Sequence, residues 1–194
     1  MASACAVVAA FGAGSASAAV IDFTGGGTGA GSGVSLSCQA LGIFNNGCSV
    51  TYNAGGLGVN GNPDYQPGRI DGSPIFSSER LTLSFAQDMV WNNVTFGHWG
   101  AHDDARIRAD GGLSFQYDGG SVLDLGGYVS SQLTISAYGN PFDGDCAGFW
   151  CTRGNDSFTV ASIDVAAVPL PASALMLLAG LGGIAAFRRK QKAA

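Results

Sequence analysis

The stretch LTLSF at residues 81–85 alternates large apolar side chains with small polar ones. The same alternation recurs in LSFQY at residues 113–117 and in LTISA at residues 133–137. Successive side chains of a β-strand point to opposite faces, so each stretch predicts a strand with one face on a core and one in water. Between its two ends the chain shows no sustained helical repeat, and Gly, Asn or Asp interrupts it roughly every eight to twelve residues.

Further short strands are expected at residues 34–38, 48–52, 90–96 and 105–108. The last strand, SFTVASIDV at residues 157–165, changes phase part-way. Phe158 and Val160 share one face, but Ile163 and Val165 follow in the opposite phase, which predicts a β-bulge near residues 160 and 161. We therefore expect residues 34–167 to form an all-β domain, an antiparallel β-sandwich that is jelly-roll-like.

The charges of the chain are divided unevenly. All 14 acidic residues lie between residues 19 and 167, where only five Arg oppose them, so this part carries a net charge of −9. Such a field repels phosphate backbones, and we expect no nucleic-acid partner. Within it, the Gly-rich stretch at residues 25–33 predicts a flexible N-terminal segment over residues 19–33.

The first residues have the composition of a secretory signal peptide. Residues 2–19 are almost all small or apolar, and Ala16-Ser17-Ala18 supplies the small-x-small pattern that signal peptidase accepts. We therefore expect residues 1–18 to form a signal peptide that is cut after Ala18. No basic residue precedes its apolar stretch, which leaves open a longer signal with an earlier start.

The other end predicts a membrane span. Residues 168–187 contain no charged side chain, and about twenty helical residues cross the hydrocarbon core of a bilayer. Four basic residues follow and should stay in the cytoplasm, which leaves the body outside the inner membrane. These residues are Arg188, Arg189, Lys190 and Lys192.

The order of these C-terminal features resembles a known sorting signal. The motif VPLPA, an apolar run with Gly-Leu-Gly-Gly, and the basic cluster Arg188-Arg189-Lys190 are similar to the PEP-CTERM class of bacterial sorting signals in its VPLPA variant. The resemblance implies recognition and removal of residues 168–194 by an exosortase, a membrane-embedded transpeptidase. It also implies a surface or extracellular location, often with extracellular polysaccharide or biofilm matrix. The motif residues are Val168, Pro169, Leu170, Pro171 and Ala172.

Four cysteines remain in the exported part: Cys38, Cys48, Cys146 and Cys151. Four cysteines allow three disulfide pairings, of which Cys38 with Cys48 and Cys146 with Cys151 are the simplest. The alternative is a zinc site, but the spacings do not match those of C-x-x-C knuckles.

Calcium is the cofactor that the sequence favours, without requiring one. Asp103, Asp104 and Asp110 lie in or beside Gly-rich turns, and Ca²⁺ takes carboxylate and carbonyl oxygens as ligands. The same residues are ordinary turn formers, and no complete calcium-loop motif is present. His98 and His102 flank the stretch Trp-Gly-Ala and are expected to be hydrated surface residues.

No catalytic motif stands out, and we expect no enzymatic activity. G-x-S-x-G is absent, and Glu79, the one Glu of the chain, would need a carboxylate partner to act as a catalytic acid. Trp99 and Trp150 are candidates for stacking on sugar rings, although aromatic side chains in a sandwich more often belong to the core.

The sequence thus predicts an exported cell-surface or matrix protein with a structural or adhesive role, anchored transiently in the inner membrane by its C-terminal helix. The alternatives are a carbohydrate-binding module, with or without a calcium requirement, and, less favoured, a hydrolase of matrix polysaccharide. Signal peptidase, an exosortase, the inner membrane and extracellular polysaccharide are the expected partners.

Overall fold

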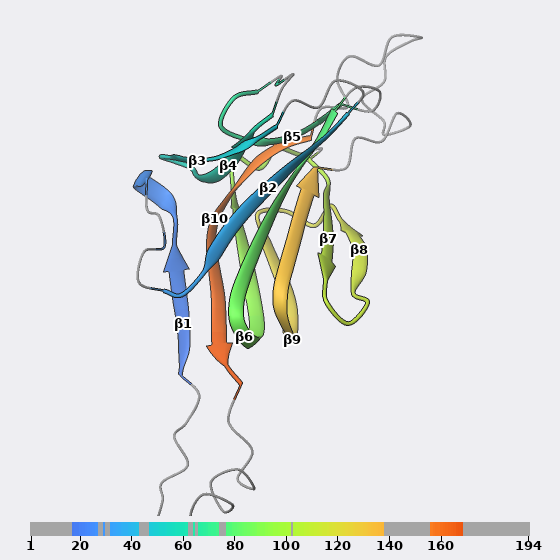
Figure 1. Cartoon of the computed structure of the whole chain (residues 1–194). Coiled ribbons are helices and arrows are strands. Elements are labelled where there is room, and N and C mark those ends of the chain that lie inside the picture. Colours follow the sequence, from blue (N-terminus) through green and yellow to red (C-terminus); the bar gives the residue numbers. More distant parts are fainter. Residues whose placement is uncertain are drawn as a thin grey trace, which may run out of the picture. The chain divides into compact units, whose positions relative to one another are not determined.

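The computed structural model describes residues 17–26, 29, 32–42, 47–61, 64, 66–73, 77–101, 103–137 and 156–168. Residues 18–167 form one compact unit, which is built almost entirely of β-strands (Figure 1). Residues 1–16 of the predicted signal peptide, the sorting motif from Pro169 on, the basic tail and the predicted pair Cys146 and Cys151 lie outside the described residues.

Ten strands make up a sheet in which every pairing is antiparallel. They are β1 (Ala18–Asp22), β2 (Ser35–Gly42), β3 (Ser49–Asn53), β4 (Gly56–Asn60), β5 (Ile70–Ser73), β6 (Ser77–Gly97), β7 (Ala105–Ala109), β8 (Ser114–Tyr117), β9 (Val122–Ala137) and β10 (Asp156–Ala167). A short 3₁₀ turn, η1 (Thr24–Gly26), is the one helical element among the described residues. The prediction of an antiparallel all-β fold is confirmed, and the jelly-roll-like connectivity stays a prediction.

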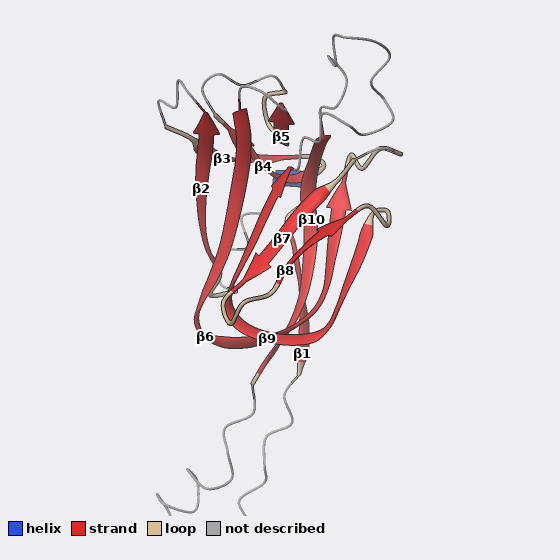
Figure 2. Cartoon of the chain, turned by 90° about the vertical axis from the view of Figure 1, so that its right-hand side faces the viewer, coloured by secondary structure: helices blue, strands red, loops and turns tan. Residues whose placement is uncertain are grey.

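Two long strands give the sheet its two layers. β6 and β9 pair along their length, and both curve sharply at one end of the domain, so that the sheet folds back on itself (Figure 2). The first part of β6 pairs with β2, and its last part pairs with β10. Each long strand therefore contributes to both layers, and the apolar faces of the layers meet.

The core lies between these layers. Its largest fully buried side chains include Trp91, whose indole N–H donates a hydrogen bond of 2.9 Å to the carbonyl of Ser130 next to the bend. The other members are apolar side chains from seven of the strands, together with Phe23 after β1. They include Ile21, Leu57, Val59, Ile70, Leu81, Leu83, Val94, Phe96, Ile107, Leu123, Leu133, Ile135, Phe158, Val160, Ile163 and Val165.

The predicted bulge in the last strand is confirmed. The register of β10 against β6 shifts between Val160 and Ser162, so Ala161 is the extra residue. The shift lets Phe158 and Val160 before it, and Ile163 and Val165 after it, all point into the core. One inserted residue thus explains the change of phase in the sequence.

The structure differs from the sequence prediction in how the strands are divided. Residues 81–85 and 90–96, expected as two strands, are parts of the single strand β6. β4 and β5 were not predicted, because glycines make up part of both. A Cβ on Gly58 in β4 would lie 2.0 Å from the carbonyl oxygen of Gly68, so only glycine allows the two segments to approach this closely.

The N-terminal boundary of the β-domain also differs. β1 begins at Ala18, the last residue of the predicted signal peptide, and continues into the segment expected to be flexible. It pairs with β10 from Ala18 opposite Ala166 to Asp22 opposite Ser162. Ile21 and the following Phe23 are buried in the core, which supplies the reason. The start of the first strand and the end of the last strand of the unit therefore lie side by side.

Cys38 and Cys48 form a disulfide, as predicted. It joins β2 to the residue before β3, and the two cysteines are ten positions apart in the sequence. Within the described residues, no helix has the length and apolar character needed to cross a bilayer.

The bulge provides a test of the fold. We expect deletion of Ala161 to reverse the facing of the residues after it, so that Ile163 and Val165 leave the core. Each buried aliphatic side chain contributes about 1.5–3 kcal/mol, so the deletion should prevent folding or lower the free energy of unfolding by several kcal/mol. Urea unfolding of soluble protein measures this.

The matched control is Ala161→Ser, which keeps the residue count and should behave nearly like the wild type. A deletion variant as stable as Ala161→Ser would contradict the role given to the bulge.

Candidate functional site: a buried carboxyl cluster

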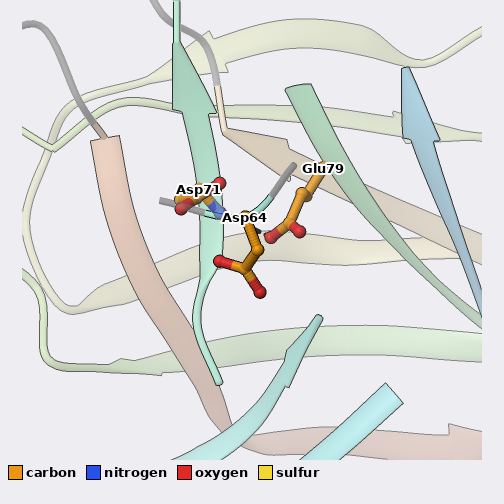
Figure 3. A group of neighbouring side chains, drawn as sticks. All are labelled: Asp64, Asp71 and Glu79. Carbon is orange, nitrogen blue, oxygen red and sulfur yellow. Dashed lines mark hydrogen bonds between the residues drawn. The ribbon is translucent and has the colours of Figure 1, made fainter. Parts of the chain in front are cut away.

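Three carboxyl groups converge where β5 and β6 meet the segment that follows β4. They belong to Asp64, Asp71 and Glu79, and one oxygen of each lies within 4.8 Å of the others. Figure 3 shows the three side chains close together, on separate segments of the chain. No other group of three or more His, Cys, Asp or Glu within the described ranges is placed closely enough to hold a metal ion.

Backbone N–H groups hold this carboxyl cluster in place. The Glu79 carboxylate accepts hydrogen bonds from the N–H of Gly61 at 2.5 Å and the N–H of Asp71 at 3.2 Å. Asp71 accepts one from the N–H of Gln66 at 2.6 Å. A Cβ on Gly61 would lie 2.6 Å from the Glu79 oxygen, so the first contact requires glycine.

The cluster is withdrawn from solvent. Asp71 and Glu79 are each 0% exposed, and Asp64 is partly buried. Both carboxylate oxygens of Asp64 are shielded and accept no hydrogen bond of good geometry from the described residues. Buried carboxylates without enough partners are costly, so something must relieve the charge here.

A proton on Glu79 is one way to relieve it. Burial, followed by the nearby charges of Asp71 and Asp64, raises the pKa of Glu79 from 4.5 to about 8, against the lowering effect of the two N–H donors. Burial also raises the pKa of Asp64, and the nearby N–H groups of Gln66 and Gly61, which donate to Asp71 and Glu79, offset this effect only in part. At neutral pH the cluster therefore holds a proton on Glu79.

A divalent cation is the other way. Ca²⁺ binds carboxylate oxygens from several loops, and three carboxylates around one point supply the charge that it needs. Cation and proton compete for the same oxygens, so binding of the cation would release the proton.

The structure does not bring the predicted calcium ligands together in this way. Asp103 accepts hydrogen bonds from the N–H groups of Gly100 and Ser157, and Asp104 accepts one from Gln116. These two residues precede β7, whereas Asp110 follows the other end of the strand and accepts a hydrogen bond from Ser131.

Trp99 packs against the core. Its ring centroid lies 4.7 Å from that of Phe96, 5.2 Å from that of Phe158 and 5.8 Å from that of Tyr117. It remains only partly exposed. Trp150 and His102 lie outside the described residues, and His98 is exposed.

Sequence reasoning singled out Glu79 but did not find its partners. Asp64 and Asp71 lie in NPDYQPGRIDG at residues 62–72, a segment rich in turn residues. Asp beside Pro or Gly is typical of ordinary turns, so nothing in the local pattern marks these carboxyl groups as neighbours of Glu79.

Comparison with known proteins identifies the end of the chain. A family described as the PEP-CTERM protein-sorting motif matches residues 167–190. The chain carries a PEP-CTERM sorting signal. The signal marks an exported protein that an exosortase handles and that is anchored in the membrane through its C-terminal part.

The β-domain is not identified by comparison. No curated protein matches the chain. It is similar to a solved structure described as truncated AlyQ with CBM32 and alginate lyase domains, at 12% identity and a TM-score of 0.35. The likeness covers 70% of this chain and 36% of that one, and it is too distant to bear on the function.

The raised pKa of Glu79 predicts how stability depends on pH. Between about 4.5 and about 8, the folded protein holds a proton that the unfolded chain has lost. The stabilisation is therefore complete below the lower value and declines as pH rises toward the upper one, by at most about 1.4 kcal/mol per pH unit. We expect Glu79→Gln, which cannot titrate, to show a smaller decline in urea unfolding over this range.

Asp88→Asn removes an exposed carboxyl group and is the matched control. It should keep the pH profile of the wild type. If Glu79→Gln also kept that profile, the assignment of the proton to Glu79 would be wrong.

Proposed function

We propose that this protein is a structural or adhesive component of the cell surface or extracellular matrix. In this proposal, an exosortase recognises the VPLPA form of the sorting signal and removes the tail, which releases the β-domain from its transient anchor. The match of residues 167–190 to the sorting motif carries the proposal.

The β-domain has features that suit this destination. Its disulfide between Cys38 and Cys48 persists in oxidising compartments and is rare in the cytosol. The disulfide closes a short loop, which stabilises the folded state by on the order of 2–3 kcal/mol through restriction of the unfolded chain. A domain held in this way can persist outside the cell.

We infer that the body acts by contact rather than by turnover. Glu79 and Asp71 are the paired carboxyl groups that a glycoside hydrolase would need, but both are fully buried. A catalytic acid must come within hydrogen-bond distance of its substrate, and their burial supports a structural or ion-binding role instead.

Processing at the C-terminus is tested by changing the prolines of the motif. Prolines hold the backbone extended before the membrane span, in a form that a peptidase can grip. We expect Pro169→Ala with Pro171→Ala to leave the tail uncut, so that the protein accumulates in the membrane fraction. Intact-mass analysis of each fraction measures cleavage of both ends and oxidation of the cysteines.

The matched control is Pro141→Ala, which changes a proline far from the motif and should be processed normally. Equal processing of the motif variant and the control would contradict recognition of VPLPA.

A carbohydrate-binding module that uses calcium is the second candidate. The carboxyl cluster favours it. The shielded oxygens of Asp64 have no hydrogen-bond partner within the described residues, and a bound cation would supply the missing interaction. Signal peptidase and extracellular polysaccharide complete the partners proposed for the protein.

Calcium binding has a distinct signature in thermal unfolding. We expect Ca²⁺ to raise the melting temperature of the chelator-treated protein, and to do so more at about pH 8.5 than at about pH 6, because the cation displaces the Glu79 proton. Asp64→Asn should abolish this shift, whereas Asp110→Asn should keep it. Loss of the shift only in Asp110→Asn would move the site to the residues predicted from sequence, and no shift in the wild type would exclude calcium.

A further inference from the structure

A second feature of the domain is a surface pocket of about 280 Å³. The turn at residues 53–55, the turn at residues 67–69 and His98 at the end of β6 line it. None of these residues belongs to the carboxyl cluster. Their side chains include one guanidinium, one imidazole and one amide, and no carboxylate.

The walls of this pocket are fixed by hydrogen bonds that join the two turns. The side-chain amide of Asn53 donates to the carbonyl of Gly68 at 2.5 Å and accepts from the N–H of Gly55 at 3.0 Å. From the neighbouring strand, the hydroxyl of Thr159 donates to the carbonyl of Gly55 at 2.5 Å. The pocket is therefore formed before any ligand arrives, which lowers the entropic cost of binding.

His98 is held at the pocket in an unfavourable backbone conformation. Its φ is 54°, and it is the one non-glycine among the described residues with a positive φ. Its ring lies so close to Gly55 that a Cβ there would be 2.0 Å from Cε1. Such conformations cost of order 1–3 kcal/mol and occur preferentially at functional sites.

Arg69 supplies the positive charge. Arg69 lines the pocket, and its guanidinium donates a hydrogen bond of 3.5 Å to the hydroxyl of Ser157. It forms no ion pair with any carboxylate of the described part of the chain. In a body with a net charge of −9, a cation at a pocket that no carboxylate lines is available to a ligand.

We propose that this pocket binds the carboxylate of an acidic sugar. A guanidinium offers parallel N–H groups that match the two oxygens of a carboxylate, and the His98 imidazole supplies a further donor. One cation balances a singly charged group, whereas the surrounding acidic field disfavours a doubly charged phosphate. Exposed Ala54 and Pro67 at the rim offer apolar surface to the sugar ring.

This inference rests on the proposed function, because it names the class of matrix component that the body would contact. It applies equally to a matrix adhesin and to a carbohydrate-binding module, and calcium is not needed for it.

The test is calorimetric titration of the exported protein with a galacturonate tetrasaccharide, and with a neutral galactose tetrasaccharide as the reference ligand. We expect the acidic oligomer to bind and the neutral one to bind at least about tenfold more weakly. Arg69→Gln should weaken binding of the acidic oligomer by about tenfold or more. Arg108→Gln, which removes the same charge from an exposed position on β7, should leave it unchanged.

His98→Gly separates binding from folding. Glycine adopts the positive φ without strain, so this variant should keep or raise the melting temperature while it weakens binding of the acidic oligomer. Equal binding of the two oligomers, wild-type affinity in Arg69→Gln, or no binding of galacturonate would each overturn the proposal. Sodium acetate and a sulfated galactose oligomer complete the series, and equally tight binding of either would overturn the specificity for a sugar carboxylate.

None of these results depends on sorting. Export and tail removal are measured by mass analysis of the cell fractions, so a failure of glycan binding leaves the proposed sorting intact, and a failure of sorting leaves the pocket to be tested.

Discussion

The sharp bend shared by β6 and β9 is the constraint on which the rest of the domain depends. Residues 85–88 of β6 lie between the pairs Ser84–Gln132 and Met89–Ser130, so the longer stretch of β6 must curve around the shorter stretch of β9. Trp91 packs at this bend against Phe85 and donates its indole N–H to the β9 backbone. Because both strands continue beyond the bend, one sheet supplies both walls of its own core.

Much of this fold could be predicted from the sequence, because burial on one face leaves a period of two in the side chains. The alternation at residues 81–85 and the phase change in β10 follow directly from that rule. The bend itself was not foreseen, since a few polar residues after Phe85 have the same composition as a turn between separate strands. β4 was missed for a different reason: Gly56 and Gly58 are required by close backbone contacts, and such contacts leave no periodic pattern.

In the two candidate sites, too, the sequence predicts only part of what the folded chain brings together. Glu79 could be singled out as an isolated acid, and His98 as one of two histidines, yet their partners come from segments that approach them only in the folded chain. Residues 53–73 supply most of both sites. The carboxyl cluster concentrates negative charge away from water, whereas the Arg69 pocket presents positive charge to it. Desolvation determines the protonation of the carboxyl cluster, whereas exposure to solvent makes the charge of the Arg69 pocket accessible to a ligand.

The pairing of Ala18 with Ala166 has a geometric consequence for a protein handled from its ends. Both ends of the β-domain leave from the same extremity, while β3, β4 and β5 lie at the opposite one (Figure 1). A tether at either terminus would therefore leave the same tip pointing away from the point of attachment. Whether the domain is tethered at its N-terminus or at its C-terminus, the end that carries residues 53–73 lies away from the tether.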